Sequence, residues 1–422
     1  MHVVLVLDHA HINGGQAKVA IDSALGLRTR GHDVTLFAAV GPIDPRLPEA
    51  GVEVICLGQP DVDTALNKAT FAAQVIWNGS AARALAERLS RCDPARTLVH
   101  VHGWAKALSS AIGPAIARSG LPAVYTMHEF FLVCPNGGFY DYPRAEICHR
   151  RPMSAACIGH NCDSRNYPRK LLRVARHAAL DHVSRMRDTI RHVVLISDLQ
   201  WEVSARYFPA AAVFHRVDNP ISVPDLGRKP GPGDAFLYVG RLSPEKGVEF
   251  FAEAARLAGV RPVIVGDGPS TDAIRARFPE AELLGWKSPD EVRAFMRGAR
   301  ALVFPSVWYE GQPLTVFEAL AVGTPVVVSD ACAGREAVAD GLNGFWFRSG
   351  DPASLAEKLL ALSDDGLAGR MSEAAYGRYW SAPLTLDRHL DRLLEVYAAA
   401  REQVLALAAA PSAAMFGSPA VG

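Results

Sequence analysis

Two glutamates, Glu310 and Glu318, combine a residue type and a spacing that could do chemistry in this 422-residue chain. Glu318 is the one charged residue in the stretch 313–323, and Glu310 lies just before that stretch. A carboxylate that is buried without partners is energetically costly. Glu318 therefore either lies on a solvent-facing stripe of a helix, or it belongs to a pair of acceptors for vicinal hydroxyls, with Glu310 on a sugar and Glu318 on a ribose.

The residues around these carboxylates predict a strand, a loop, a helix and a second strand. Residues 301–305 form an apolar run typical of a strand buried on both faces, and residues 324–329 form another. Between them, Pro313 occupies a first helical position, and Gly323 followed by Pro325 ends the helix. In such a unit the loop and the helix N-terminus lie at the carboxyl end of the sheet, where free N–H groups favour phosphate.

Two cations, Arg241 and Lys246, follow another predicted strand at residues 235–241. Ser243 is a suitable N-cap with Pro244 at the first helical position, which places Lys246 in a first helical turn. A lysine there is unfavourable with the helix dipole, so a bound anion would explain it. The alternative is that both cations are isolated surface charges.

Residues 310–327 read EGQPLTVFEALAVGTPVV and resemble the signature of retaining, nucleotide-sugar-dependent glycosyltransferases of the GT-B fold, the large family four (glycosyl transferases group 1). Two glutamates separated by seven residues are a feature of that family. Residues 240–247, GRLSPEKG, resemble the family's diphosphate motif. The resemblance extends over essentially the whole chain and is strongest for residues 240–330.

The resemblance implies a nucleotide-sugar donor in a cleft between two domains. Arg241, Lys246 and a helix N-terminus would stabilise the leaving diphosphate, while Glu310 and His128 would position the sugar. The implied reaction retains the anomeric configuration and needs no catalytic metal. The residues that would bind the donor are Gly14, Gly15, Gly268, Gly311, Gln312, Pro313, Leu314 and Glu318.

Three of the predicted site residues, Gly14, Gly15 and His128, lie in the N-terminal half. Gly14 and Gly15 precede a predicted helix over residues 16–30, without the full G-x-G-x-x-G spacing. They form either a plain turn or a close backbone approach to phosphate, and the resemblance favours phosphate. His128 follows a predicted strand at residues 123–127. It is either a satisfied polar residue or a ligand contact, and the resemblance places a histidine here beside the donor sugar.

Four of the seven cysteines lie within residues 134–162. Thiolates in a reducing compartment suit a closed structural zinc site, although no C-x-x-C pair is present. The alternatives are plain reduced cysteines and disulfides. The four candidates are Cys134, Cys148, Cys157 and Cys162.

Residues 165–191 are strongly basic, with apolar residues interleaved as in an amphipathic helix. The segment is either a solvated face or a surface for an anionic lipid or a lipid-pyrophosphate acceptor. The second interpretation predicts peripheral contact with a membrane.

Composition sets the broad class. The chain contains 44 Lys+Arg and 44 Asp+Glu, so its net charge gives no argument for nucleic acid. It has no uninterrupted apolar run long enough to span a bilayer. Its first residues lead directly into a strand, so we expect no signal peptide and a cytoplasmic location, either free or peripheral on the inner face of the membrane.

Strands alternate with helices along the chain, which predicts an α/β fold with parallel sheets. A turn-rich linker separates an N-terminal Rossmann-like acceptor domain, residues 1–220, from a C-terminal Rossmann-like nucleotide-sugar domain, residues 221–380. The resemblance implies that the helix at residues 381–407 crosses back to the N-terminal domain. Residues 408–422 are predicted to be disordered.

These expectations combine into a retaining glycosyltransferase that moves a sugar from a nucleoside-diphosphate sugar to a glycan, lipid-linked or lipopolysaccharide-type acceptor. A nucleotide-sugar epimerase shares the architecture but would need no acceptor. A dinucleotide-dependent oxidoreductase would require the missing glycine fingerprint. An inactive binding protein is a further alternative.

Overall fold

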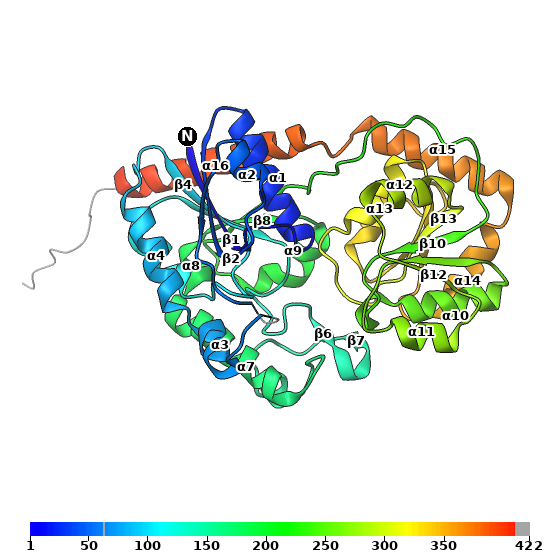
Figure 1. Ribbon diagram of the computed structural model, residues 1–422, viewed down its shortest axis with the longest axis horizontal. Helices are drawn as coiled ribbons and strands as arrows, with labels where there is room; N and C mark the ends of the chain where they lie inside the picture. The colour runs from blue at the N-terminus through cyan, green and yellow to red at the C-terminus, as the bar shows by residue number, and fades with distance from the viewer. Residues whose placement is uncertain (62–63, 410–422) are drawn as a thin grey trace, which may run out of the picture.

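The structure is a computed structural model that describes residues 1–61 and 64–409. Figure 1 shows two α/β domains side by side, each built on a parallel sheet with helices on its faces. The α/β fold with two Rossmann-like domains is therefore confirmed. The disorder predicted for residues 408–422 concerns mainly residues 410–422, which lie outside the described residues.

The first sheet has seven parallel strands with β1 inside it. Its order is β3 (Glu53–Cys56), β2 (Asp33–Val40), β1 (His2–His9), β4 (Thr97–Val101), β5 (Ala123–Met127), β8 (His192–Leu195) and β9 (Val213–Arg216). The helices of this domain are α1 (Gly15–Thr29), α2 (Arg46–Glu49), α3 (Lys68–Ile76), α4 (Gly79–Ser90), α5 (Ile112–Ser119), α6 (Ala155–Ile158), α7 (Tyr167–Ala178), α8 (Met186–Thr189) and α9 (Asp198–Ser204). The apolar run of β1 is buried on both faces, as its composition predicts.

The second sheet has six parallel strands. Its order is β12 (Glu282–Gly285), β11 (Pro262–Val265), β10 (Phe236–Val239), β13 (Ala301–Phe304), β14 (Val326–Ser329) and β15 (Gly344–Phe347). Its helices are α10 (Val248–Ala258), α11 (Thr271–Arg277), α12 (Pro289–Gly298), α13 (Leu314–Ala321), α14 (Pro352–Ala361) and α15 (Asp365–Ser381). Two apolar clusters pack against the two faces of this sheet.

Three edge strands, β9, β12 and β15, are not predicted by the sequence. Each contains half-buried or exposed residues and lacks the continuous apolar run that identifies a central strand. A small antiparallel pair, β6 (Tyr140–Asp141) with β7 (Glu146–Ile147), lies in the cysteine-rich segment and is also unpredicted. Short polar strands carry little periodic signal, so these elements depend on tertiary pairing.

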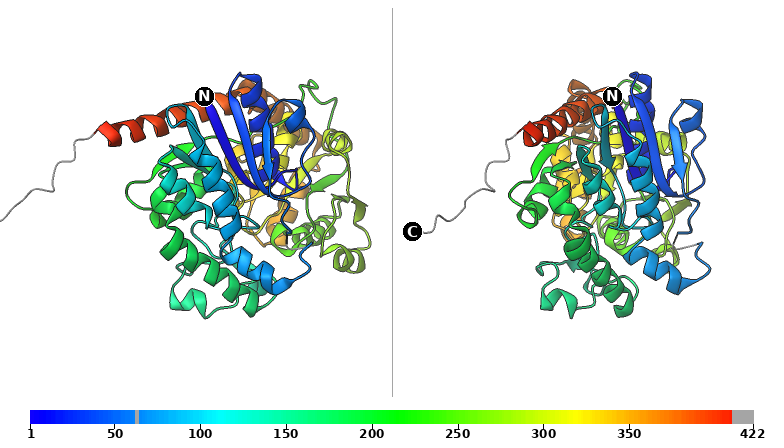
Figure 2. Two further views of the ribbon diagram at one scale, coloured as in Figure 1. Left: turned by 60° about the vertical axis from the view of Figure 1, so that its left-hand side comes forward. Right: turned by 90° about the vertical axis from the view of Figure 1, so that its left-hand side faces the viewer.

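The last helix, α16 (Leu386–Ala409), crosses back to the first domain, as the resemblance implied. Figure 2 shows it in red against the first sheet. Its apolar side chains join the core that lies under α1, and the Tyr397 hydroxyl lies 2.7 Å from His100 Nδ1. Among the described residues, no helix has the length and hydropathy needed to cross a bilayer.

Candidate active site

Loops from the carboxyl ends of both sheets meet between the two domains, where open α/β sheets bind ligands. A Cβ placed on Gly15 would lie 3.6 Å from Leu314 Cδ1 at the start of α13. A Cβ placed on Gly311 would lie 3.2 Å from the His128 carbonyl oxygen. The structure therefore brings the predicted positions of the first domain against the predicted loop of the second.

Glu310 is held by three donors that all reach the same carboxylate oxygen. Oε1 lies 2.6 Å from Lys246 Nζ, and it accepts hydrogen bonds from Ser306 Oγ and Trp308 Nε1, each at 2.7 Å. Burial alone would raise the pKa of Glu310, but the Lys246 charge and these hydrogen bonds outweigh it and lower the pKa below its ordinary value. The group is an oriented carboxylate whose second oxygen has no partner among the described residues.

Trp308 is a site residue that the sequence did not single out. Its indole donates to Glu310, and Lys246 Nζ lies 5.2 Å from the centre of its ring. The ring also meets the cysteine-rich segment of the first domain, because a Cβ on Gly138 would approach it to 2.8 Å. The sequence feature that could have indicated its role is its place as an aromatic residue two positions before Glu310. Trp308 thus links the first domain to the carboxylate of the second.

Glu318 lies on α13 without a hydrogen-bonded network around its carboxylate among the described residues. Its side chain is half-buried and forms no hydrogen bond or ion pair with any described residue. Burial raises its pKa, and the charges of Lys18 on α1 and Arg293 on α12 oppose that shift. A carboxylate without a partner between two domains suits a ligand hydroxyl better than the solvent-facing stripe considered above.

Lys246 occupies a different local structure from the predicted helix turn. Pro244–Lys246 form a short 3-10 turn, and α10 starts only after Gly247, whose φ of +67° is left-handed. A side chain at Gly247 would overlap the Pro305 carbonyl, so the turn needs glycine and packs on the strand before the Glu310 loop. The contact between Gly247 and Pro305 places Lys246 within hydrogen-bonding distance of Glu310.

Arg241 and Gly268 flank the same end of the second sheet. Arg241 is exposed, and its side chain has no hydrogen bond or ion pair among the described residues. A Cβ on Gly268 would overlap the backbone of Leu242, so the two loops are in direct contact. The guanidinium is therefore available to an anion that enters the cleft.

Gln312 and Pro313 connect the site to the interdomain linker. Gln312 Oε1 accepts a hydrogen bond from the Asn219 N–H at 2.6 Å. Gln312 Nε2 and Asn219 Oδ1 are buried without partners. Pro313 is the N-cap of α13 rather than its first residue, and Leu314 begins the helix. The loop that carries Glu310 is thus tied to the linker.

His128 is half-buried and lies next to two fully buried imidazoles, those of His102 and His100. Its Nε2 lies 3.1 Å from His102 Nδ1, and the two rings are stacked. Burial lowers the pKa of His128 to about 3, with a smaller contribution from His389, and burial also lowers the pKa of His102 and His100. The imidazole of His128 is therefore neutral and acts as a hydrogen-bonding group rather than as a cation.

The structure does not assemble the predicted zinc site. Within the described residues, no group of three or more His, Cys, Asp or Glu side chains is placed to hold a metal ion. Cys157 and Cys162 both contact Lys170 Nζ, whereas Cys134 is buried and Cys148 is half-buried. All four are free cysteines, so a structural zinc ion remains a prediction for elemental analysis.

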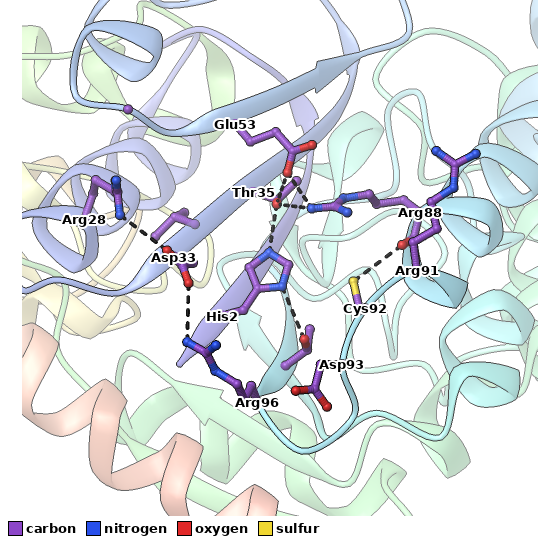
Figure 3. Close-up of a pocket in the computed structure, with 13 residues that line it drawn as sticks. His2, Arg28, Asp33, Thr35, Glu53, Arg88, Arg91, Cys92, Asp93 and Arg96 are labelled. Carbon is purple, nitrogen blue, oxygen red and sulfur yellow. Dashed lines mark hydrogen bonds and ion pairs between the residues drawn. The ribbon is translucent and has the colours of Figure 1, made fainter.

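A separate hollow of about 400 Å³ lies at the other end of the first sheet, where its strands begin (Figure 3). His2, Asp33 and Thr97 line it, and these residues stand at the amino ends of β1, β2 and β4. Arg88 pairs with Glu53 there, while Arg28 and Arg96 lie 3.6 Å from Asp33. Ligands of open α/β sheets bind at the carboxyl ends of the strands, and none of the predicted site residues lines this hollow.

Two family models match the chain, Glycosyltransferase Family 4 over residues 13–184 and Glycosyl transferases group 1 over residues 233–365. The glycogen synthase of Mycobacterium tuberculosis is 30% identical over 302 residues, which are 64% of this chain and 70% of that enzyme. The chain belongs to the glycosyl transferases group 1 family. In this group 1 protein, the two glutamates and Lys246 lie in the matched region 233–365.

Other group 1 relatives match in part. The UDP-Gal:alpha-D-GlcNAc-diphosphoundecaprenol alpha-1,3-galactosyltransferase of Escherichia coli is 28% identical over 38% of this chain, and the match spans only 44% of that enzyme. Among solved structures, HepE of Anabaena in complex with UDP has a TM-score of 0.64 at 17% identity, covering 94% of this chain and 100% of HepE. The sucrose-phosphate synthase of Thermosynechococcus elongatus has a TM-score of 0.65 at 16% identity, covering 96% and 99%. These structures establish the same GT-B fold.

Proposed function

We propose that this chain transfers a sugar from a nucleoside-diphosphate sugar to a glycan, lipid-linked or lipopolysaccharide-type acceptor, with retention at the anomeric carbon. The observation that carries the proposal is the half-buried carboxylate of Glu318, which has no partner in the part of the chain that the structure describes, on the same loop-and-helix unit as the oriented carboxylate of Glu310. Glu318 would accept hydrogen bonds from a ribose and Glu310 from the donor sugar. The complex of HepE with UDP supports a nucleotide as the ligand of this fold.

Charge on the leaving diphosphate would be stabilised by fixed cations and dipoles. Arg241 has no side-chain partner among the described residues, and Lys246 is already oriented by Glu310. The N–H groups at the start of α13 add a positive dipole end. In this proposal Arg241, Lys246 and the α13 N-terminus together stabilise the charge on the diphosphate and no catalytic metal is needed, so EDTA should leave the rate unchanged.

The acceptor would enter from a hollow between the domains that continues past the Glu310 loop. This hollow measures about 480 Å³. Phe139 and Tyr207 line it from the first domain with their rings stacked, and Tyr309 lines it from the second. Aromatic faces of this kind suit the apolar face of a sugar ring. The acceptor of the E. coli relative, a diphosphoundecaprenol, supports a lipid-linked acceptor.

Peripheral membrane contact is part of the same proposal, on the inner face of the membrane. In the basic segment 165–191, Arg165 and Arg185 are exposed beside exposed Leu171 and Val183. Lys170, by contrast, is buried and cannot contribute. Partitioning to anionic vesicles that persists unchanged after Arg165→Glu with Arg185→Glu would remove this part of the proposal.

The first experiment is calorimetric titration of the protein with UDP, GDP, ADP and NAD, repeated with Glu318→Gln. Tight binding of one nucleoside diphosphate that weakens in the variant supports the donor site and names the base. Binding of NAD alone would contradict it. The matching nucleotide sugar is then incubated without acceptor, because a changed sugar released under those conditions would indicate an epimerase. The anomeric coupling constant of a transfer product tests retention.

A further inference from the structure

Lys170 is a buried lysine with unusual neighbours. It stands in the first turn of α7, and only 1% of its surface is exposed. Its Nζ lies 3.3 Å from Cys162 Sγ and 3.5 Å from Cys157 Sγ. Among the described residues, no carboxylate lies within ion-pair distance of this nitrogen. An ammonium buried among thiols alone is poorly compensated.

The acidic residues of the cysteine-rich segment, Asp141 and Asp163, form ion pairs with groups other than Lys170. The Asp163 carboxylate lies 2.7 Å from Arg173 Nε. The Asp141 carboxylate lies 3.1 Å from Arg150 Nη1 and 2.5 Å from His160 Nε2. Burial raises the pKa of the Cys162 thiol, which works against a thiolate as counter-charge, although the neighbouring cysteines offset the burial of Lys170 and raise the pKa of its amine. The sulfurs and the nitrogen are therefore in contact without a strong ion pair to explain their arrangement.

We propose that Lys170 and Cys162 form an oxidative modification site, in which one oxygen atom joins Lys170 Nζ to Cys162 Sγ. The oxidant is dioxygen. A lysine amine, a cysteine thiol and O₂ give the N–O–S linkage and one water, so nitrogen and sulfur each lose two electrons and O₂ gains four. One N–H bond and the S–H bond supply the two hydrogens of the water, besides the proton that an ammonium loses first.

A disulfide between Cys157 and Cys162 is the competing product, and the burial of Lys170 argues against it. Such a disulfide would consume both thiols that contact Nζ and leave an ammonium in the interior without a partner. The N–O–S linkage instead converts the nitrogen into an uncharged group. Cys162 Sγ is the nearer of the two sulfurs to Lys170 Nζ, at 3.3 Å against 3.5 Å for Cys157 Sγ, so a linkage to Cys162 requires the smaller movement of atoms.

The linkage would fasten α7 to the segment that forms one wall of the cleft. The Cys162 carbonyl accepts a hydrogen bond from Asn136 Nδ2 at 2.9 Å, and Asn136 lies two residues before Gly138, which meets Trp308. The proposal itself is independent of the transfer reaction, because it concerns a covalent bond that mass spectrometry can detect without substrate.

The test compares full-length protein purified in air with protein prepared under argon with reductant. Both samples are digested without reduction, and the peptides are analysed by tandem mass spectrometry. We expect the aerobic sample to contain a peptide pair joined through Lys170 and Cys162, with one oxygen gained and two hydrogens lost. Dithiothreitol should release both peptides, and the anaerobic sample should lack the pair. This comparison needs no variant to fold.

Three variants sharpen the assignment. Lys170→Arg keeps a cation but should abolish the cross-link, and Cys162→Ser should do the same. Cys92→Ser removes a half-buried thiol at the far edge of the first sheet and should leave the cross-link intact. A Cys157–Cys162 disulfide that lacks the extra oxygen would overturn the proposal. So would alkylation of both thiols in the aerobic protein, or one zinc ion per chain bound to these cysteines.

Discussion

The two halves of the molecule are built from different titratable groups. All 14 histidines lie in residues 2–215 or at position 389, and residues 216–388 contain none. His389 stands on α16, which packs on the first domain, and its Nε2 lies 3.1 Å from Ser23 Oγ. The second domain instead holds its part of the site with Glu310, Glu318, Lys246 and Arg241. The first domain therefore meets the cleft with an uncharged imidazole, that of His128, whereas the second domain meets it with charged side chains.

The difference has a physical origin in what each half is predicted to bind. A diphosphate needs permanent positive charge, which lysine and arginine supply at any neutral pH. Neutral imidazoles such as His128 donate or accept single hydrogen bonds, as sugar hydroxyls require. The first domain also buries His100 and His102 beside His128, where protonation would be costly.

The largest effect that we predict from this comparison is a loss of stability in mild acid. Burial lowers the pKa of His128 and His177 to about 3 and of His389 to about 4, from 6.5. Below about pH 6.5 the unfolded chain gains protons that the folded first domain does not accept. The free energy of unfolding should fall by several kcal/mol, on the order of 5, between pH 7 and pH 5, as measured by urea titration.

A matched pair of variants tests the assignment to buried histidines. His177 is buried beside Asp181, whereas His182 is exposed in the same segment. His177→Gln should make the pH dependence shallower by about one proton, and His182→Gln should leave it unchanged. Identical pH profiles for all three proteins would contradict the explanation.

The next largest effect is expected for Lys246→Ala. The change removes a cation predicted to contact the diphosphate and leaves Glu310 without its ion-pair partner. We expect kcat/KM to fall about 100-fold, corresponding to roughly 2–3 kcal/mol. Lys358→Ala on α14, away from the cleft, is the control. A rate near that of the wild type would mean that Lys246 serves only the fold.

A smaller effect is expected for Glu318→Gln, which keeps the shape of the side chain and removes its charge. Nucleoside-diphosphate affinity should weaken about ten-fold, because hydrogen bonds from ribose hydroxyls to a carboxylate are stronger than those to an amide. Calorimetry measures this directly, with the exposed Glu357→Gln on α14 as control. Equal loss in both variants would point to instability rather than to a lost contact.

The smallest effect concerns the contact that joins the two halves. Trp308→Phe keeps an aromatic ring against Gly138 but removes the N–H that reaches Glu310. We expect kcat to fall about three- to ten-fold with donor affinity nearly unchanged. Gly138→Ala should have a comparable effect, because its Cβ would displace the same ring. If kcat is unaffected in both, Glu310 is oriented by Lys246 and Ser306 alone.

Much of the second domain could be predicted because its signals are local. The apolar run at residues 301–305, Gly323 with Pro325, and the spacing of Glu310 and Glu318 lie within 30 residues. Their predicted strand–loop–helix–strand order is present as β13, α13 and β14. The predicted roles of the two glutamates remain predictions, although the structure places both at the cleft.

The remaining features depend on distant contacts. The pairing of Lys246 with Glu310 joins residues 64 positions apart, and the turn that makes it possible is a 3-10 turn rather than the predicted helix. The chain from His100 through His102 to His128 requires β4 and β5 to be neighbours, which alternation alone does not specify. Nothing in the local sequence indicates that Lys170 turns inward.

The return of α16 to the first domain has a consequence for biosynthesis. The core under α1 includes Leu390, Leu393, Val396 and Tyr397, so the first sheet cannot close that core until these residues have left the ribosome. The second domain has all its strands and its own apolar core by residue 381. The half made later therefore finishes folding earlier, and the N-terminal half must wait with an exposed apolar face that chaperones would recognise.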